Sequence, residues 1–422
     1  MVMIMTNSND YNVYEILEKV KIASKELNIL STIGKNSAII KIAEALIRNS
    51  DKIIEANKLD LENGKKKNLT NAMLNRLELT KEKLESIAND MIKISNLNDP
   101  VGEVIDSYTH PNGIVINKVR VPFGVILAIY ESRPNVSVDI ACLCLKTNNA
   151  IVLRGGSEAI NSNKVLVETM RNAIKDIVNP DVITLIENTD RAIVNDLIKA
   201  KDYIDLVVPR GGKALIQNVV NNASVPFIET GAGNCHIYVD NEYELDKALD
   251  VIINAKVSRP AVCNAIETIL INKGIAYEFL PLLKRELDKY NVEIRGCEKC
   301  RKLVSVNEAL EEDYYKEYND YIVTIKIVEG VDEAIDHINK YGTKHSDAIM
   351  TTNMAKAEKF MNNIDSACVY VNASTRFSDG GEFGFGAELG ISTQKLHARG
   401  PMGLKEMTTY KYKIYGDGQV RK

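Results

Sequence analysis

Short apolar runs alternate with longer segments of helical periodicity through most of the chain beyond residue 123. The run VILAIY (125–130) is continuous and apolar, which is typical of a strand that is covered on both faces. AIVLRG, DVITLIE, IDLVVPRGG and HIYVD come next, and each precedes a segment with helical spacing of its apolar residues. Strands and helices that alternate with short links predict a parallel, doubly wound α/β sheet.

A second series of the same kind begins after Cys263. Its candidate strands are TILI, VEIR, YIVTIKIV, SDAIMTT and ACVYVNA, with helical segments between most of them. A chain of 422 residues has room for more than one domain, since a domain takes roughly 150 residues. We therefore predict one α/β domain from residues 1–102 and 123–237 and a second from residues 238–375.

The first hundred residues predict helices. Residues 12–27, 35–66 and 79–97 place apolar side chains three and four positions apart, with Lys and Glu on the other faces. Asp99 and Pro100 then end this helical part.

Two segments with alternating apolar and polar residues predict a small β-sheet outside these domains. Residues 113–121 alternate in this way, and so does KEMTTYKYKIYGDGQV (405–420). A terminal strand without a partner exposes unpaired backbone groups, so we expect the two segments to pair. Residues 103–122 and 395–422 are thus predicted to form a β-flap that adds to another subunit. Pairing only within the chain is the alternative.

Charge and apolar content exclude two classes of partner. Lys and Arg number 53 against 57 Asp and Glu, so the net charge of −4 predicts no surface for nucleic acid or for a membrane. No apolar run approaches the roughly 20 residues of a membrane-spanning helix. The start, MVMIMTNSNDYN, has neither a basic segment nor a cleavage site, so we expect no signal peptide.

The cysteines and histidines predict a reducing, cytoplasmic setting and no metal site. Seven scattered Cys without a secretion signal favour unbridged thiols. Cys297 and Cys300 form a CxxC, but a zinc ribbon needs a second pair, so we interpret this one as a solvated loop. The five His lack HxxxH or HxH spacing.

Glycine-rich turns follow two of the predicted parallel strands. The residues concerned are Arg154, Gly155, Gly156 and Ser157 in the first turn, and Arg210, Gly211 and Gly212 in the second. Glycines there let backbone N–H groups approach a ligand, the helix that follows favours an anion, and arginine adds a cation. Two such turns favour a phosphate-bearing cofactor, whereas each turn alone is equally typical of an ordinary strand–helix link.

Three further residues are candidates for chemistry, and each has a structural alternative. Cys263 is a nucleophile if its thiol ionises, or an inert buried cysteine. Asn135 follows a buried strand and has an amide that can stabilise an oxyanion, or it caps a helix. Glu229 stands at a strand end, where a carboxylate acts as a base or holds a ribose, or it belongs to a surface turn.

Long motifs spread over nearly the whole chain resemble those of a known family. They are VPFGVILAIYESRPNVSVD, IVLRGGSEAINSN, VPRGGKALI, IETGAGNCHIYVD, SRPAVCNAIETILI and FGFGAELGISTQKLHARGPMGLKEMTTYKY. On these residues the chain resembles the gamma-glutamyl phosphate reductases of the aldehyde dehydrogenase superfamily. The resemblance implies an aldehyde dehydrogenase-like α/β fold, in which residues 1–102 and 123–237 bind the cofactor, residues 238–375 are catalytic, and the β-flap serves oligomerisation.

The resemblance also implies roles for single residues. Cys263 matches the catalytic cysteine, and Asn135 matches the oxyanion-hole asparagine, with the backbone N–H of Cys263 as second donor. Arg154 stands where many members carry a cofactor-binding lysine, and VPRGG stands at the turn that faces the cofactor. Glu317 looks like the ribose-binding glutamate. Glu229 falls near the general-base glutamate, although ETGAG is shorter than the usual turn.

The implied reaction is the NADPH-dependent reduction of L-glutamyl 5-phosphate to L-glutamate 5-semialdehyde and phosphate, through a thioester on Cys263. This is the second step of proline biosynthesis. A substrate with a carboxylate and a phosphate needs cationic anchors, for which Arg399, Arg259 and Arg133 are the candidates in that order. Implied partners are further copies of the chain and the glutamate 5-kinase.

Two other functions stay open at this point. One is another acylating aldehyde dehydrogenase of the acyl-CoA reductase type, and the other is a non-catalytic subunit on the same scaffold. The arginine-containing HARGPMG segment argues against the first, and the presence of both Cys263 and Asn135 argues against the second.

Overall fold

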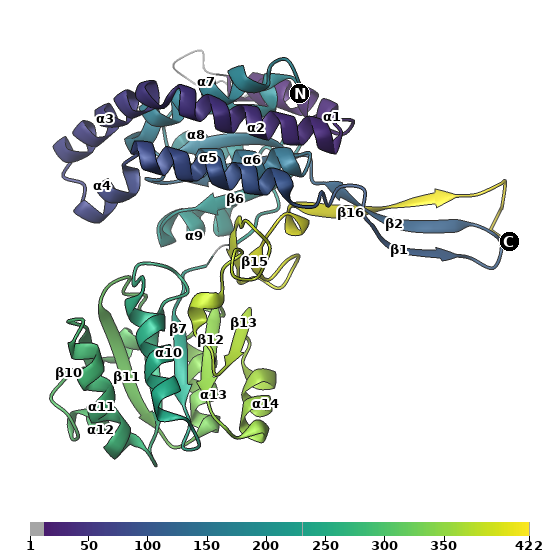
Figure 1. The fold of residues 1–422 in the computed structure, drawn as a ribbon. Coiled ribbons are helices and arrows are strands. Elements are labelled where there is room, and N and C mark those ends of the chain that lie inside the picture. The colour runs from purple at the N-terminus through teal and green to yellow at the C-terminus, as the bar shows by residue number, and fades with distance from the viewer. Residues whose placement is uncertain (1–11, 230, 422) are drawn as a thin grey trace. The chain divides into compact units, whose positions relative to one another are not determined.

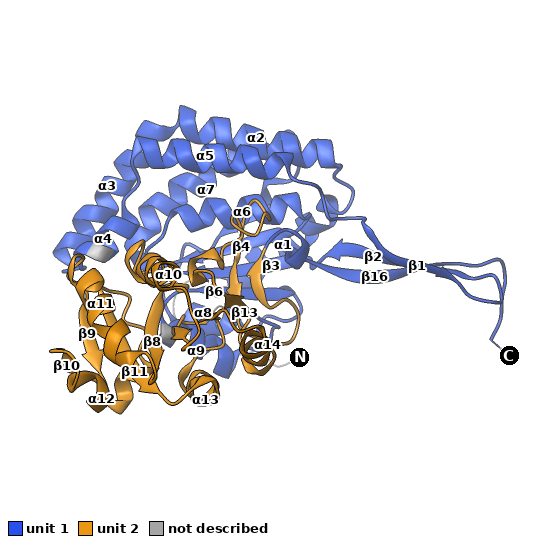
Figure 2. Ribbon diagram, turned by 60° about the horizontal axis from the view of Figure 1, so that its bottom comes forward, with its two compact units in different colours: residues 1–229, 403–422 blue, residues 230–402 orange. Residues whose placement is uncertain are grey.

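A computed structural model describes residues 12–229 and 231–421, which fall into two compact units (Figures 1 and 2). Unit 1 consists of residues 1–229 and 403–422, and unit 2 of residues 230–402. The start of the chain, where we expect no signal peptide, lies outside the described residues. Among the helices of the described part, none combines the length and the apolar character that a membrane crossing requires.

Unit 1 is built on a parallel four-stranded sheet with strand order β5-β4-β3-β6. Every residue of the central strand β3 is buried, because the sheet is covered on both faces. The strands are β3 (Val125–Tyr130), β4 (Ala150–Gly155), β5 (Ile183–Leu185) and β6 (Leu206–Arg210), and the helices that follow them are α6 (Asn135–Lys146), α7 (Ile160–Ile174), α8 (Ala192–Leu197) and α9 (Lys213–Asn222).

The predicted amino-terminal helices are confirmed. They are α1 (Val13–Leu27), α2 (Thr32–Arg48), α3 (Ser50–Lys66), α4 (Asn71–Leu77) and α5 (Lys81–Asn96). Side-chain oxygens of Asn12, Ser31 and Thr80 accept backbone N–H bonds at the starts of α1, α2 and α5, so each helix begins at a capping residue. The buried carboxylate of Asp60 in α3 accepts the N–H groups of Asn161 and Ser162, which fixes the start of α7.

The strand pairing predicted for the β-flap is also confirmed. The three strands are β1 (Val104–Thr109), β2 (Val115–Pro122) and β16 (Thr408–Tyr415). β2 lies in the centre and pairs antiparallel with both neighbours, with Lys411 opposite Val119. The sheet projects as a long ribbon from the helices of unit 1, and every residue of β1 is exposed (Figure 2).

Unit 2 holds a parallel seven-stranded sheet with strand order β10-β9-β11-β8-β7-β12-β13. Its strands are β7 (Cys235–Val239), β8 (Ile266–Asn272), β9 (Glu293–Gly296), β10 (Asn307–Glu308), β11 (Ile322–Val328), β12 (Ser346–Met350) and β13 (Cys368–Val371). Its helices are α10 (Leu245–Val257), α11 (Ala276–Asp288), α12 (Glu298–Arg301), α13 (Val331–Tyr341) and α14 (Met354–Asn363). A short hairpin of β14 (Gly390–Ser392) and β15 (Gly400–Met402) follows.

One strand belongs to a different sheet from the one that the sequence pattern indicates. HIYVD ends the first strand–helix series along the chain, but the corresponding strand β7 lies in unit 2, between β8 and β12. All five residues of β7 are buried. A fully buried strand has the same apolar pattern in either sheet, so the pattern does not reveal its partners.

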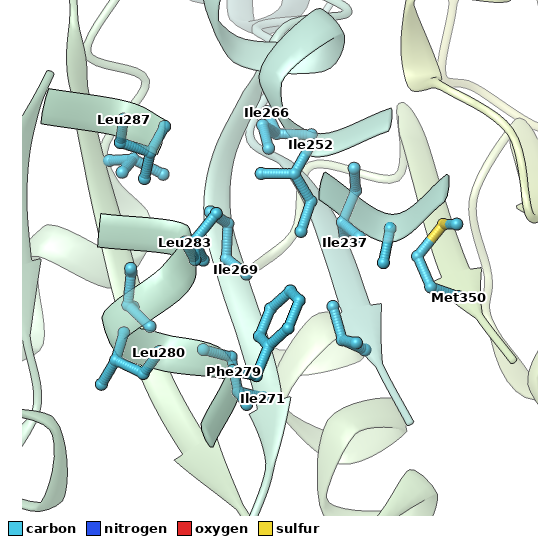
Figure 3. Packing of buried hydrophobic residues seen from close by; sticks show 14 of the residues in the cluster. Ile237, Ile252, Ile266, Ile269, Ile271, Phe279, Leu280, Leu283, Leu287 and Met350 are labelled. Atoms are coloured by element: carbon cyan, nitrogen blue, oxygen red, sulfur yellow. The ribbon is translucent and has the colours of Figure 1, made fainter. Parts of the chain in front are cut away.

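Helices α10 and α11 cover one face of the unit 2 sheet with apolar side chains (Figure 3). Phe279 and Leu283 of α11 pack against Ile269 and Ile271 of β8, and all four are fully buried. The core beneath α11 therefore depends on Phe279 and Leu283, which lie four positions apart on one face of the helix.

Leu283→Ala is expected to lower the free energy of unfolding of unit 2 by about 2–5 kcal/mol, because the lost methyl groups leave a cavity. The matched control is Tyr277→Ala on the same helix, whose residue is 79% exposed. The control is expected to change this free energy by less than about 0.5 kcal/mol. Urea unfolding of both variants measures the difference, and equal losses would contradict this account of the core.

Candidate active site

Cys263 lies in the turn between α10 and β8, just before the amino end of β8. Its side chain is half-buried, and the turn is closed by a bond of 3.0 Å from the N–H of Ala265 to the carbonyl of Val262. Cys263 is therefore not an inert core cysteine like Cys142 and Cys144, which are fully buried in α6.

The backbone of Cys263 is held by residues that lead into β7. A Cβ atom placed on Gly233 would lie only 1.5 Å from the carbonyl oxygen of Cys263, so no other residue fits at position 233 without moving this turn. The thiol of Cys235 donates to the same carbonyl at 3.2 Å. Burial raises the pKa of Cys235 well above its usual value, so this thiol keeps the proton that it donates. The carbonyl of Cys263 is thus fixed by a close contact and by a hydrogen bond.

Glu317 binds the backbone of Gly233, the residue that contacts the Cys263 carbonyl. Its carboxylate accepts the backbone N–H of Gly233 at 2.8 Å, and the residue lies between the short helix η3 (Glu311–Tyr315) and β11. Gly233, Cys263 and Glu317 all precede parallel strands of one sheet, so they share the edge at the amino ends of these strands. Two residues that the sequence singled out separately, Cys263 and Glu317, are therefore joined through Gly233.

The residue after Cys263 is clamped by the short helix η4 (Thr375–Phe377). Asn264 is buried; its amide N–H₂ donates to the carbonyl of Ser378 at 2.9 Å, and its amide oxygen accepts from the guanidinium of Arg376. Thr375 donates to the carbonyl of Asn264 at 2.7 Å. These bonds fix the side chain and the carbonyl of Asn264, the residue that directly follows Cys263.

Arg376 is a residue that the sequence analysis missed. Burial lowers the pKa of its guanidinium, the positive charge of Arg259 lowers it further, and its charge also interacts with Cys263. Its Nε donates to the hydroxyl of Ser258 at 3.2 Å. Arg376 and Arg259 supply positive charge that suits an anion, while the carboxylates of Asp379 and Glu382 act on the Arg376 guanidinium in the opposite direction. The only available signal was its place in ASTRF, directly after the last strand of the second series.

Of the three predicted anchors, Arg259 is the one whose charge acts on Arg376, and Arg399 and Arg133 lie in different surroundings. The guanidinium of Arg399 donates to both the carbonyl oxygen and the carboxylate of Asp365, at 2.7 and 3.1 Å, so it takes part in an ion pair within unit 2. Arg259 and Arg133 are exposed, Arg259 in unit 2 and Arg133 in unit 1.

Asn135 is the first residue of α6 in unit 1. Its side chain does not cap this helix, because Pro134 occupies the capping position; the amide N–H₂ instead donates to the carboxylate of Asp139 at 2.9 Å. Burial raises the pKa of Asp139 to about 6. The bond to Asp139 orients the Asn135 amide and uses one of its two N–H donors.

The guanidinium of Arg154 binds backbone carbonyls of two separate segments. Its guanidinium donates to the carbonyls of Gly155, Thr189 and Asp190 at 2.7–3.1 Å, which ties the end of β4 to the loop before α8. Arg154 is 7% exposed, so its side chain makes little direct contact with solvent, and it acts on the surface of this turn chiefly through its positive charge.

Two carboxylates link the turns at the carboxyl edge of the unit 1 sheet. Glu131 accepts the N–H of Gly212 at the start of α9 at 2.8 Å. Glu158 accepts the N–H and the hydroxyl of Ser132, at 2.6 and 2.9 Å, next to Ser157. The start of α9 thus accommodates an anionic oxygen, as expected of a turn that faces a phosphate.

Glu229 is half-buried and ends the first segment of unit 1.

Comparison with known proteins agrees with this architecture. A model of the aldehyde dehydrogenase family matches residues 2–301 and 316–412. The chain belongs to the aldehyde dehydrogenase family.

Individual relatives have a more specific name than the family as a whole. The gamma-glutamyl phosphate reductase of Clostridium perfringens is 56% identical over 406 residues, which cover 96% of this chain and 98% of that protein. A gamma-glutamyl phosphate reductase of Caldanaerobacter subterraneus is 53% identical over 407 residues, covering 96% and 98%. The crystal structure of the gamma-glutamyl phosphate reductase of Thermotoga maritima has a TM-score of 0.95 at 50% identity, and the match covers 97% of this chain and 100% of that chain.

Membership in the aldehyde dehydrogenase family confirms the predicted fold and makes the chain an oxidoreductase that uses a nicotinamide cofactor. The residues at the carboxyl edge of the unit 1 sheet fit such a group. Gly211 and Gly212 are exposed, and the N–H of Gly212 already faces an anionic oxygen, whereas Gly155 and Gly156 are buried against Asn163 and Glu158.

Gly233→Ala is expected to lower kcat by about 100-fold, because the new methyl group displaces the carbonyl of Cys263 and misplaces its thiol. Gly330→Ala is the matched control, since a Cβ there meets nothing within 4 Å. Steady-state kinetics of both variants, with thermal unfolding to confirm that each folds, tests this contact. Unchanged kcat in a folded Gly233→Ala variant would show that the contact does not position the thiol.

Proposed function

We propose that this protein reduces L-glutamyl 5-phosphate to L-glutamate 5-semialdehyde and phosphate with NADPH, the second step of proline biosynthesis. The proposal rests on high identity to gamma-glutamyl phosphate reductases over nearly the whole chain. The structural observation that carries it is the half-buried Cys263, whose backbone is fixed by Gly233 and Asn264 beside two arginines.

The first step is covalent. The Cys263 thiolate attacks the acyl carbon of the substrate, and the carbonyl oxygen of the substrate becomes an oxyanion that Asn135 and the N–H of Cys263 stabilise. The tetrahedral intermediate collapses with release of phosphate and leaves a thioester on Cys263. Because the Asn135 amide is oriented by Asp139, its second N–H is the donor available for this oxyanion.

The second step is reduction. The nicotinamide cofactor, when bound, supplies the hydride that converts the thioester to the level of an aldehyde. Collapse of the resulting thiohemiacetal regenerates the Cys263 thiolate and releases the product. No water is consumed, so this direction needs no base to activate water, and Glu229 has no required catalytic step.

Roles for the other residues complete the proposal. Arg154, Gly155, Gly156, Ser157, Arg210, Gly211 and Gly212 hold the dinucleotide, with Glu229 and Glu317 near its ribose. The charge of Arg154 supports NADP over NAD; its Nη1 and Nη2 atoms donate to backbone carbonyls. Arg376 and Arg259 receive the phosphate, while Arg399 and Arg133 remain candidates for the carboxylate.

We also propose that the protein is a homo-oligomer. The strand β1 is fully exposed and forms an edge of the β1-β2-β16 sheet, so its outer backbone groups are available to a second copy. Association with the glutamate 5-kinase stays a prediction.

Cys263→Ala is expected to abolish turnover, because no other group forms the thioester. The assay runs in reverse: glutamate 5-semialdehyde, NADP⁺ and inorganic phosphate are supplied, and NADPH is measured. Cys297→Ala, at the other half-buried cysteine, is the control and is expected to retain activity. Turnover that requires coenzyme A would indicate an acyl-CoA reductase. A well-folded wild-type protein with no turnover would indicate a non-catalytic subunit.

Arg376→Ala is expected to raise the KM for phosphate by about 10- to 100-fold, since a hydrogen bond to a charged group contributes about 1.5–3 kcal/mol. Arg285→Ala, at an exposed arginine of α11, is the control and should leave this KM unchanged. The same reverse assay at varied phosphate gives both values. A fall in kcat at constant KM would instead assign Arg376 to positioning of Asn264.

A further inference from the structure

The CxxC of unit 2 does not lie in a solvated loop, contrary to the interpretation of its sequence. Cys297 follows β9, and Cys300 lies in α12 and is fully buried within the apolar core of unit 2. Cys297 is half-buried, and its neighbours Glu298 and Lys299 are exposed. Cys297 is therefore the more exposed residue of the pair.

The two sulfur atoms lie 3.5 Å apart, which is within hydrogen-bonding distance for sulfur. A disulfide has a sulfur–sulfur distance of about 2.05 Å, so small side-chain rotations are sufficient to join them. Gly296 permits this approach: a Cβ there would lie 2.8 Å from the Cβ of Cys300. The two sulfur atoms are thus neighbours before any oxidation, and Gly296 leaves room for Cys300.

The charges of the pair differ in the way that thiol–disulfide exchange requires. The hydrogen bond between the two sulfur atoms lowers the pKa of Cys297 to about 5, with support from the backbone N–H groups of Ile327, Cys300 and Lys299. The same bond and burial raise the pKa of Cys300. The lowered pKa favours the thiolate form of Cys297, while the raised pKa favours the protonated form of Cys300.

We propose that Cys297 and Cys300 form a thiol–disulfide exchange site whose substrate is an external disulfide, such as that of oxidised glutathione. The Cys297 thiolate attacks one sulfur of the external disulfide, forms a mixed disulfide and releases the first thiolate. Cys300 then loses its proton to solvent and attacks Cys297 Sγ, which releases the second thiolate. The external disulfide gains two electrons, and the protein loses two electrons and the Cys300 proton.

The wild-type protein, equilibrated in buffers of increasing oxidised-to-reduced glutathione ratio, tests the proposal. Acid quenching, alkylation and peptide mass spectrometry are expected to show a Cys297–Cys300 disulfide that increases with the ratio. Cys142 and Cys144, both fully buried, are the internal control and should stay reduced. Cys297 and Cys300 that stay reduced with the control cysteines, or that oxidise only together with them, would overturn the proposal.

Two variants check the order of events. Cys300→Ala removes the resolving thiol, so glutathione is expected to accumulate as a mixed disulfide on Cys297, whereas Cys297→Ala should leave Cys300 unmodified. In the wild type, alkylation of Cys297 should level off above about pH 6, and in Cys300→Ala it should keep rising toward pH 8 or higher. A wild-type rate that also rises through pH 8 would contradict the thiolate assignment.

Discussion

The contact between Gly233 and the carbonyl of Cys263 is the constraint on which the site in unit 2 depends. It allows the segments that lead into β7 and β8 to approach closely at the amino-terminal edge of the sheet. The N–H of Gly233 then holds Glu317, and the buried thiol of Cys235 holds the same Cys263 carbonyl. A nucleophilic thiol needs a defined position as well as ionisation, and here the backbone supplies that position before any ligand binds.

Positive charge is the second property of this edge. Arg376 uses one side of its guanidinium to fix Asn264 and brings its charge near Cys263 and Arg259. In the proposed reaction the acyl phosphate places its leaving group beside the attacking sulfur, so positive charge at this edge would favour the departing phosphate. Arg399, in contrast, is held by Asp365 and contributes to the packing of unit 2.

The sequence predicts much of the fold and less of the site. The buried strand VILAIY, the capped helices and the pairing of β2 with β16 follow from local patterns of burial and hydrogen bonding. β7 was assigned to the wrong series because a strand buried on both faces has no pattern that names its neighbours. Arg376 and Gly233 were missed for a related reason: their importance comes from contacts with Asn264 and Cys263, which are distant in sequence.

The most direct test of the account is to trap the covalent intermediate. The protein is mixed with glutamate 5-semialdehyde and NADP⁺ without phosphate, quenched rapidly in acid, and analysed by peptide mass spectrometry. We expect a glutamyl group in thioester linkage on the peptide that carries Cys263, and this group should disappear when phosphate is added before the quench. NADPH formation with no acyl group on Cys263, or with the group on another residue, would contradict it.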